Sequence, residues 1–367
     1  MKISDSKKRT IILTLTRQCN LACTYCFEHN KSSECMDVCT AMEIIKKEYK
    51  ELQQDEILEV DFFGGEPFLT FNVLRKIVEE VEDSYMRDDI LFFVDTNGTL
   101  INDEIKEWLC SHSQILVCGL SYDGTPHMQD MNRSGSSFCI DLDFFKEIYP
   151  YQTIKMTVSK ETLPYLAEGV EYLENKGFEV ACNLAYGIDW SAESFYEMLE
   201  QELLKLINRY LKNPDITPCS ILNTSILPIA MGEKEKRRFC GAGINMVSYD
   251  VDGKTYPCQL FMPISVGKKK ARESQDIIFY EKIPNNLLDE KCCGCVIKSV
   301  CPTCYGANYQ EFGNIYWQNE SYCKLQKIIF KAISFFKGMQ WEKKQIYVSE
   351  KEEALLLKSI EIIQKGL

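Results

Sequence analysis

The sequence predicts an α/β fold in which helices cover a parallel sheet, followed by a smaller cysteine-rich region. Two observations carry this prediction. Apolar strand-like runs alternate with amphipathic stretches up to about residue 212, and glycine or asparagine marks many of the junctions. The chain also has 18 cysteines in 367 residues, many of them grouped in its second half. A chain of this length is expected to form one large domain and a smaller one.

The alternating elements follow a regular order. Strand-like runs occur at residues 10–16, 57–63, 90–95, 114–121, 153–158 and 179–185. Amphipathic helical stretches are expected at residues 38–54, 71–86, 101–111, 138–148 and 162–177. This order is typical of a parallel sheet with helices outside it, either as an open sheet or as a barrel. Six strand–helix units fit into this part of the chain, fewer than the eight of a complete barrel.

The chain changes character after this first part, residues 1–212. Residues 213–239 contain Pro214, Pro218 and a charged run, which predict a linker. Residues 240–325 have short apolar runs, many turn residues and grouped cysteines. We expect inorganic clusters to stabilise that region, because it has too few apolar residues for a large core. Residues 326–367 are helical in pattern and form a predicted tail.

Composition and charge exclude several classes of protein. A formal net charge of −12 argues against a nucleic-acid groove, which needs a basic face. No apolar run approaches the roughly 18 residues that cross a bilayer, and the N-terminus lacks a signal-peptide core. We therefore expect a cytoplasmic protein that binds neither nucleic acid nor a membrane. Its thiols are then expected to be reduced, and reduced thiols in tight groups are typical of metal or cluster ligands.

The first cysteine group has the spacing C-x3-C-x2-C and follows the first predicted strand directly. Its members are Cys19, Cys23 and Cys26. Three thiolates on a four-iron cluster leave one iron open to a small molecule, unlike the four-cysteine runs of ferredoxins. A zinc site with His29 as the fourth ligand is the alternative.

This loop resembles the cluster loop of radical S-adenosylmethionine (SAM) enzymes, which have an aromatic residue before the last cysteine. Tyr25 occupies that position here. In that family the aromatic ring backs the adenine, and the methionyl amine and carboxylate chelate the open iron of a [4Fe-4S] cluster. One electron from the cluster then cleaves SAM to a 5′-deoxyadenosyl radical. The resemblance implies the same chemistry for Cys19, Cys23 and Cys26.

The resemblance also implies SAM contacts from the ends of the second, third and fourth strands. The residues concerned are Gly64, Gly65, Glu66, Pro67, Thr96, Asn97, Ser121, Asp123 and Arg133. The first four resemble the GGEP motif, in which glycines let the backbone approach the ligand and the carboxylate accepts from its ammonium group. The last three resemble an S-x-D-G…D-x-x-R stretch, with Gln129 where the family often has histidine. All are expected at carboxyl ends of strands, where parallel α/β folds gather their sites.

Seven cysteines after residue 239 resemble the SPASM extension of the same family, which carries two auxiliary [4Fe-4S] clusters. By this resemblance one cluster is fully capped by Cys292, Cys295, Cys301 and Cys323. The other has three ligands, Cys240, Cys258 and Cys304. Its fourth ligand is not assigned, although Cys219 and Cys293 are candidates. Zinc-ribbon sites are the alternative for these paired cysteines. Cys118 and Cys182 lie in strand-like runs and are expected to be buried.

Taken over about residues 10–325, the resemblance implies a partial (β/α)6 barrel of the TIM type, a small irregular iron–sulfur (SPASM) domain and a helical tail. It implies three [4Fe-4S] clusters and SAM as cofactors. The expected partners are a peptide or protein substrate and a reductant such as flavodoxin or ferredoxin. Only about nine residues precede the first strand. We therefore expect a leader peptide to be recognised by the barrel, the SPASM domain, the tail or a separate leader-recognition protein.

The resemblance points to a maturase that crosslinks ribosomal peptides through C–S, C–C or C–O bonds. Anaerobic sulfatase-maturating enzymes, which make formylglycine, are the alternative. Those enzymes commonly have an aspartate after the second SPASM cysteine as a general base, and Gln259 stands there instead. A neutral amide cannot accept the proton, so Gln259 is interpreted as a neighbour of the substrate. An iron–sulfur electron-transfer protein without SAM chemistry is an alternative of another class.

Overall fold

The computed structural model describes residues 7–232 and 238–367. Residues 233–237, which hold most of the charged run of the predicted linker, lie outside the described residues. The chain divides into two compact units. The first comprises Met1–Tyr122, Arg133–Lys155 and Gly241–Phe279, and the second comprises Asp123–Asn132, Met156–Cys240 and Tyr280–Leu367.

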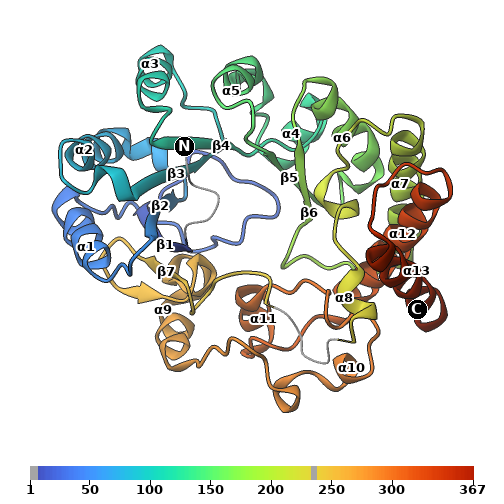
Figure 1. Ribbon diagram of the computed structural model, residues 1–367. Coiled ribbons are helices and arrows are strands. Elements are labelled where there is room, and N and C mark those ends of the chain that lie inside the picture. The colour runs from blue at the N-terminus through green and yellow to red at the C-terminus, as the bar shows by residue number, and fades with distance from the viewer. Residues whose placement is uncertain (1–6, 233–237) are drawn as a thin grey trace. The chain divides into compact units, whose positions relative to one another are not determined.

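The first unit is built on a six-stranded sheet (Figure 1). Its strands are β1 (Lys7–Thr16), β2 (Glu56–Gly64), β3 (Ile90–Thr96), β4 (Leu116–Leu120), β7 (Met246–Tyr249) and β8 (Thr255–Tyr256). They lie in the order β4-β3-β2-β1-β7-β8. Neighbouring strands are parallel except for β8, which is antiparallel to β7. The carboxyl ends of β1, β2 and β3 therefore meet at one edge of the sheet.

Helices cover one face of this sheet, as Figure 1 shows for α1, α2 and α3. The helices of the unit are α1 (Val38–Lys50), α2 (Phe71–Glu82), α3 (Asp103–His112), α5 (Leu142–Ile148) and α9 (Pro263–Glu273). Burial alternates along β2 and β3, so one face of each strand is fully buried and the other is half-buried. On the buried face Phe62 stacks on Phe92, with ring centroids 5.3 Å apart. The half-buried face carries polar side chains, which a purely structural core would exclude.

The second unit is mainly helical. Its helices are α4 (Pro126–Asn132), α6 (Leu166–Asn175), α7 (Glu193–Lys212), α8 (Leu227–Ala230), α10 (Glu290–Cys293), α11 (Tyr305–Phe312), α12 (Glu320–Glu342) and α13 (Glu350–Gly366). A two-stranded sheet pairs β5 (Ile154–Val158) with β6 (Val180–Leu184), and the first two residues of β5 belong to the first unit. Helix α12 packs against α7 and α13, and α13 packs against α8.

The remaining elements are short 3-10 helices. They are η1 (Pro67–Thr70), η2 (Arg87–Asp89), η3 (Ser137–Cys139), η4 (Leu163–Tyr165), η5 (Ser220–Leu222), η6 (Gln259–Phe261), η7 (Ser274–Asp276) and η8 (Asn285–Leu287). Among the described residues, no helix combines the length and the apolar character that crossing a bilayer requires.

The α/β class, the parallel sheet and the helical tail are confirmed. The strands predicted at 153–158 and 179–185 pair with each other, and one parallel bridge, between Ser121 and Lys155, joins β5 to the end of β4. Strands β7 and β8, from the cysteine-rich region, were not predicted, and they extend the sheet of the first unit beyond β1. Strand β7 is four residues long and pairs in parallel with β1, far away in sequence. A strand this short has no periodicity that sequence analysis could detect.

Candidate functional site

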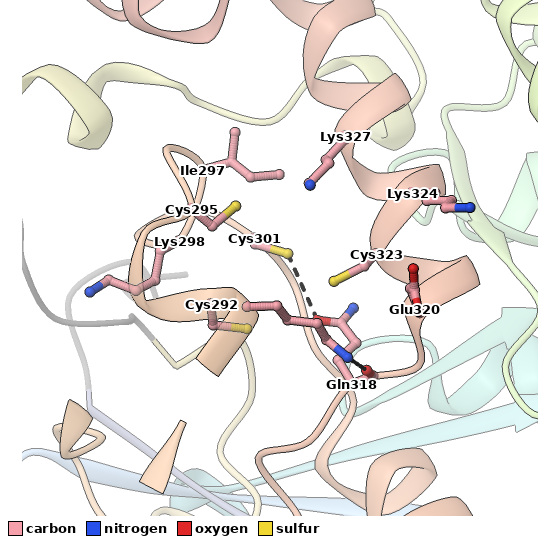
Figure 2. A pocket seen from close by; sticks show the side chains of 11 residues that line it. Cys292, Cys295, Ile297, Lys298, Cys301, Gln318, Glu320, Cys323, Lys324 and Lys327 are labelled. Carbon is pink, nitrogen blue, oxygen red and sulfur yellow. Dashed lines mark hydrogen bonds between the residues drawn. The ribbon is translucent and has the colours of Figure 1, made fainter. Parts of the chain in front are cut away.

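Four cysteines of the second unit line one cavity of about 350 Å³ (Figure 2). They are Cys292, Cys295, Cys301 and Cys323, the set predicted to share a fully capped cluster. They come from α10, from the loop after it and from the first turn of α12, and their sulfur atoms face a common space in Figure 2. The structure thus brings together thiols from separate segments of the chain.

Helix caps position two of these cysteines. Asp289 begins α10 by accepting a hydrogen bond from the backbone N–H of Lys291, at 3.2 Å, which fixes the turn that holds Cys292. Asn319 begins α12 in the same way, accepting from the N–H groups of Ser321 and Tyr322. The residue after Tyr322 is Cys323, so its thiol sits in the first turn of α12.

The donor set of this cavity fits a capped four-iron cluster, which needs four thiolates and no other ligand. Burial raises the pKa of the Cys323 thiol, the neighbouring Cys292 raises it further, and Lys291 opposes both effects. Without a metal the Cys323 thiol therefore favours the protonated form, and bound iron is what would hold it as a thiolate. The thiol of Cys301 contacts the Pro302 carbonyl at 3.6 Å and Gln318 Oε1 at 4.0 Å.

The second predicted ligand set is divided between the two units. Cys304 begins α11, and its sulfur accepts from the N–H of Ala307 at 3.5 Å. Burial raises the pKa of the Cys304 thiol, and nearby Cys240 raises it further. Cys258 belongs to the first unit, where it is buried before η6. The three-ligand set therefore stays a prediction.

The two candidates for a fourth ligand have other surroundings. Cys219 is 1% exposed, and its backbone N–H donates to the Tyr210 hydroxyl at 3.0 Å. Cys293 is exposed, and its thiol points to the Asp289 carbonyl at 3.8 Å. No fourth ligand is assigned from them. The predicted burial of Cys118 and Cys182 is confirmed.

No three His, Cys, Asp or Glu side chains in residues 7–232 and 238–367 converge as ligands of a single metal ion. Thiols around a four-iron cube lie farther apart than the ligands of one ion, because each binds a different corner. The zinc alternatives, which need tightly grouped ligands, receive no support from the described residues.

The first cysteine group lies in the irregular loop between β1 and α1. Cys19, Cys23 and Cys26 are all partly exposed. The loop is held by its own backbone, since the N–H of Cys26 donates to the Cys23 carbonyl at 3.1 Å. The ammonium of Lys31 closes it by donating to the Leu21 carbonyl at 3.2 Å. Burial raises the pKa of the Cys19 thiol, so here too iron would be needed to hold a thiolate.

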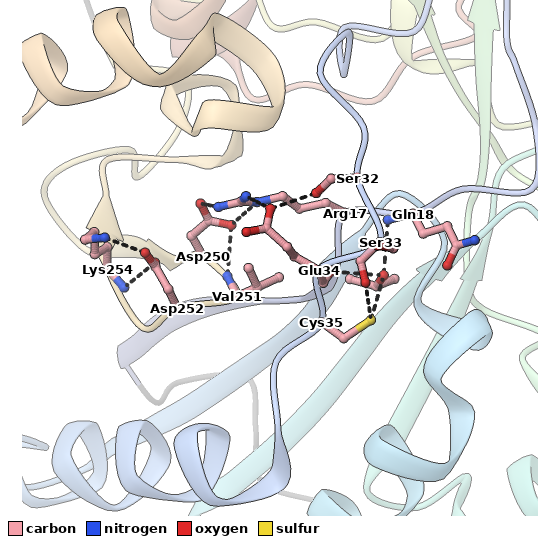
Figure 3. Close-up of polar contacts among 11 residues, drawn as sticks. Arg17, Gln18, Ser32, Ser33, Glu34, Cys35, Asp250, Val251, Asp252 and Lys254 are labelled. Atoms are coloured by element: carbon pink, nitrogen blue, oxygen red, sulfur yellow. Dashed lines mark hydrogen bonds and ion pairs between the residues drawn. The ribbon is translucent and has the colours of Figure 1, made fainter.

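A buried ion pair ties the start of this loop to the hairpin of β7 and β8 (Figure 3). Arg17 follows β1 directly, and its Nε and Nη2 donate to the two carboxylate oxygens of Asp250, at 3.0 and 2.6 Å. Asp250 is 0% exposed and Arg17 is 7% exposed. Arg17 also pairs with the exposed Glu34 at the far end of the loop. The sequence gives no sign of this clamp, because its partners are far apart in the chain.

The two glycines of the GGEP turn let it pass close to the cluster loop. The N–H of Gly65 donates to the Thr16 carbonyl at 3.0 Å. A Cβ on Gly65 would lie 2.2 Å from the Gln18 carbonyl oxygen and 2.9 Å from Cys19 Cβ. A Cβ on Gly64 would lie 2.3 Å from the Thr16 oxygen. Glycine is therefore needed at both positions because the turn packs directly against the backbone that leads into the cluster loop.

Glu66 is buried, and its carboxylate is held by the chain itself. Oε1 accepts from the Thr96 hydroxyl at 2.8 Å and from the N–H of Phe68 at 3.2 Å. Oε2 accepts from the N–H of Asn97 at 2.8 Å. Burial raises the pKa of Glu66 to about 7, against the effect of these donors. Pro67 continues directly into η1. In this structure Glu66 braces the ends of β2 and β3, and its contact with a ligand stays a prediction.

The ends of β3 and β4 are linked to the same loop. The side-chain amide of Asn97 donates to Asn20 in the cluster loop at 3.0 Å, and Asn20 donates to Thr99 at 2.8 Å. The N–H of Ser121 donates to the Thr96 carbonyl at 3.0 Å. Asn20 was missed by sequence reasoning because its partners come from another strand end.

Tyr25 and Arg133 lie together in the structure. The guanidinium of Arg133 lies over the Tyr25 ring, 5.5 Å from its centroid. Arg133 also lies close enough to Glu66 to lower its pKa, the weakest of the effects on that carboxyl. The next residue, Ser134, accepts from the N–H of Ala22 in the cluster loop at 3.0 Å. Tyr25, Arg133 and Glu66 therefore surround one region beside the three cysteines.

Asp123 has a different environment, in the second unit. It is 0% exposed and accepts from the N–H of Thr157 at 2.8 Å and from Asn132 at 3.1 Å. Gln129 accepts from the N–H of Asp123 at 2.8 Å. Asp123 is thus an internal brace between α4 and β5, and this geometry does not support its predicted role as a cofactor contact. Gln129 has a structural partner in the position where the family often has histidine.

The half-buried face of the sheet carries a group of charges that sequence reasoning missed. Lys155 pairs with Asp95, and its ammonium lies 5.1 Å from the centroid of the Phe93 ring. Burial raises the pKa of Asp61 to about 7, and the negative charges of Glu59 and Asp95 add to this effect. A carboxyl that titrates near neutral pH is suited to acid–base chemistry.

A family model described as a 4Fe-4S single cluster domain matches residues 9–137. That range contains Cys19, Cys23 and Cys26 together with the GGEP turn, Asn97 and Arg133. The match therefore covers the loop and the strand ends that the structure brings together.

Relatives in sequence include an uncharacterized protein of Methanocaldococcus jannaschii, 36% identical over 169 residues. That alignment covers 44% of this chain and 57% of the archaeal protein. The radical SAM cyclopropyl synthase TigE of Paramaledivibacter caminithermalis is 23% identical over 358 residues, covering 89% of this chain and 74% of TigE. A cysteine-type anaerobic sulfatase-maturating enzyme of Clostridium perfringens is 24% identical over 298 residues, covering 73% of this chain and 78% of that enzyme.

Solved structures share the fold. The structure of anSMEcpe with bound AdoMet superposes with a TM-score of 0.69 at 19% identity, covering 95% of this chain and 98% of that one. Streptococcus suis SuiB bound to its precursor peptide SuiA gives a TM-score of 0.55 at 15% identity, covering 85% of this chain and 75% of SuiB. The cysteine spacing of the cluster loop, the matched 4Fe-4S family model and the radical SAM relatives all point to the same class of protein. The homologues of this chain include radical SAM peptide maturases and sulfatase-maturating enzymes, and the chain has their fold.

Proposed function

We propose that the protein is a radical SAM enzyme that modifies a ribosomal peptide. A [4Fe-4S] cluster on Cys19, Cys23 and Cys26, once reduced, supplies the electron that cleaves SAM to a 5′-deoxyadenosyl radical, which removes a hydrogen atom from the peptide. The observation that carries the proposal is the convergence of these cysteines with Tyr25 and Arg133 beside the GGEP turn.

The residues around the cluster loop have distinct roles in this proposal. Tyr25 backs the adenine of SAM, and the Arg133 guanidinium, which lies over that ring, is placed to bind the carboxylate. The backbone of Gly64 and Gly65 lies against the loop and offers polar groups to the SAM ammonium. Glu66 holds that turn in place through Thr96 and Asn97. Ser121, at the end of β4, is the proposed contact for the ribose.

The auxiliary cysteines complete the reaction in this proposal. Loss of a hydrogen atom leaves a peptide radical. Formation of a C–S, C–C or C–O crosslink then releases one proton and one electron. Cys292, Cys295, Cys301 and Cys323 would hold one auxiliary cluster, and Cys240, Cys258 and Cys304 would hold the other. Either cluster, when bound, would supply an acceptor for this electron. A reductant such as flavodoxin or ferredoxin supplies the first electron, and a separate leader-recognition protein is a further proposed partner.

Formylglycine formation is the second candidate, because relatives in sequence and in structure include sulfatase-maturating enzymes. It requires a base near the substrate, and Gln259 cannot act as one. The side-chain oxygen of Gln259 is buried and, among the described residues, accepts no hydrogen bond. An unpaired amide oxygen beside Cys258 suits contact with a polar group of the peptide better than proton abstraction.

Mass spectrometry of the reaction product distinguishes these candidates. The reconstituted protein is incubated anaerobically with SAM, dithionite and cysteine-containing peptides, one from a neighbouring short reading frame and one with a sulfatase motif. Crosslinking predicts a product lighter by two hydrogen atoms that resists alkylation at the linked cysteine. An aldehyde in which the cysteine has lost its sulfur would contradict crosslinking and support formylglycine formation. SAM turnover with either peptide excludes a simple electron-transfer protein.

A further inference from the structure

The cavity that holds four cysteines also has a concentration of lysines. Lys291, Lys298, Lys324 and Lys327 line it, together with a single acidic residue, Glu320. The chain as a whole has a net charge of −12, so a basic group of this size runs against the average. Lys291 is already paired with Asp289 at 2.9 Å and donates to the Gln318 carbonyl at 2.5 Å. Lys298, Lys324 and Lys327 add three further positive charges to the lining, and the Lys324 ammonium lies 5.5 Å from the centroid of the Tyr196 ring.

Helix geometry arranges part of this charge as a row. Lys324 and Lys327 are three residues apart on α12, and Lys331 follows four residues later, so the three share one face of the helix. All three are exposed. Figure 2 shows Lys298 and Lys324 directed away from the sulfur atoms and Lys327 directed toward them. The row thus extends from the cavity outward over the surface of the second unit.

The ligand set limits what the cavity can do. Four thiolates cap every corner of a four-iron cluster, so no iron remains to bind a substrate. Such a cluster exchanges electrons or is purely structural. Cys295 and Cys323 are partly exposed, which puts an edge of the cluster site near the protein surface. A redox centre near the surface and ringed by one sign of charge is suited to a partner of the opposite sign.

We propose that this lysine rim, formed by Lys298, Lys324, Lys327 and Lys331, is the docking surface for an acidic one-electron carrier protein. One-electron exchange at this surface is reversible. During turnover the capped auxiliary cluster would lose the electron that product formation leaves on it, and the oxidised carrier would gain it. This inference rests on the proposed function, because it assumes that the four cysteines hold a cluster. The alternative is that the lysines only offset the negative charge of the cluster, in which case they would change its potential but recognise no partner.

Electron delivery to the auxiliary clusters tests the proposal. Cys19, Cys23 and Cys26 are replaced by alanine, so that electrons can enter only those clusters, and the protein is reconstituted with iron and sulfide. Reduced flavodoxin is the probe, and stopped-flow absorbance gives the second-order rate. The test variant is Lys324→Glu/Lys327→Glu. The matched control is Lys351→Glu/Lys358→Glu, an equal charge change at exposed positions of α13.

At low ionic strength the rim variant is expected to accept electrons from flavodoxin roughly 10-fold more slowly than the control, and added salt should shrink the difference. Reduced methyl viologen, a small cation that needs no docking surface, should not show this loss. Equal rates with flavodoxin in both variants would overturn the proposal. So would an equal loss with flavodoxin and methyl viologen, because that result means a shifted potential.

A second measurement uses the wild-type holoprotein and does not depend on electron transfer. A carbodiimide joins lysines to carboxylates that lie in contact, and mass spectrometry locates the links to flavodoxin. Links at Lys298, Lys324, Lys327 or Lys331 are expected. Links confined to other lysines would contradict the proposed surface. Failure of this docking test leaves dithionite-driven SAM cleavage intact, whereas failure of the proposed function abolishes it.

Discussion

The carboxylate of Glu66 receives hydrogen bonds from η1 and from the end of β3. The variant Glu66→Ala distinguishes two roles for this side chain: holding the ends of β2 and β3 together, or contacting SAM directly. If Glu66 is a brace, the variant leaves buried donors unpaired and loses about 2 kcal/mol of stability along with SAM binding. Thermal unfolding and equilibrium dialysis of SAM measure the two effects. Lost SAM binding at unchanged stability would instead show that Glu66 acts only on the ligand.

Asp250 is the buried half of the clamp on the cluster loop. Its replacement by asparagine leaves the Arg17 guanidinium without its buried counter-charge and with only the exposed Glu34 as a partner, which costs about 3 kcal/mol. We expect Asp250→Asn to unfold at lower temperature and to retain less iron on the loop. Asp252→Asn, in the same hairpin but part of an exposed pair with Lys254, is the control and should cost at most about 1 kcal/mol. Equal stabilities of the two variants would contradict the clamp.

Asp61 predicts a pH dependence of stability. Its pKa rises from 3.8 to about 7 on folding, so the folded protein binds the proton more tightly than the unfolded chain. The contribution of Asp61 to stability is therefore complete below pH 4 and is lost as the pH rises to about 7. Asparagine does not titrate. The unfolding free energy of Asp61→Asn, relative to wild type, should thus rise by roughly 2–4 kcal/mol between pH 4 and pH 8.

Chemical denaturation at several pH values measures this effect of Asp61. Asp88→Asn, which removes a carboxylate that is 94% exposed, is the control. If the difference in unfolding free energy between Asp61→Asn and wild type stayed constant from pH 4 to pH 8, the raised pKa of Asp61 would be wrong.

Residues in local motifs were predictable, and residues that act across the fold were not. Tyr25 and Arg133 could be assigned because each stands at a fixed place in a short pattern. Arg17 and Asp250 are 233 positions apart, and nothing in either neighbourhood indicates a pair. Asp123 shows the opposite problem, since it stands in a motif but is fully buried and bonded to Thr157 and Asn132.

At the scale of elements, the contact between the GGEP turn and the cluster loop is the critical one. Gly65→Ala places a methyl group 2.2 Å from the Gln18 carbonyl oxygen, which is backbone and cannot move aside freely. We expect the turn and loop to separate, with loss of iron from the loop and loss of SAM binding. The measurements are iron content after reconstitution and equilibrium dialysis of SAM.

Gly338→Ala is the matched control for Gly65→Ala. It lies inside α12, where the nearest atom to an added Cβ is 3.8 Å away, so it should be neutral or slightly stabilising. If Gly65→Ala bound iron and SAM as well as Gly338→Ala, the turn would not depend on this close approach.

Elements with long periodic patterns were predictable from sequence. All six strands predicted before residue 212 occur in the structure, with boundaries within a few residues of the predicted ones, because alternating or continuous apolar runs specify them. Helix α4, at Pro126–Asn132, was not predicted from the sequence. Strand β7 was missed because its stability comes from pairing with β1 and not from its own sequence.

At the scale of the whole molecule, cleavage of SAM and completion of the product are proposed to depend on different cysteines. Cys26→Ala should abolish both, whereas Cys295→Ala should spare cleavage and stop product formation. Three clusters of four irons predict about twelve irons per chain in the wild type and about eight in either variant. Native product formation by Cys295→Ala would contradict the role given to the auxiliary clusters.

The most direct test of the central claim is the production of 5′-deoxyadenosine. Wild-type protein with its iron reconstituted, reduced by dithionite and supplied with SAM, should release 5′-deoxyadenosine over many turnovers, and Cys26→Ala should release none. The claim would be contradicted if the wild type, with its full iron content, produced no more 5′-deoxyadenosine than Cys26→Ala.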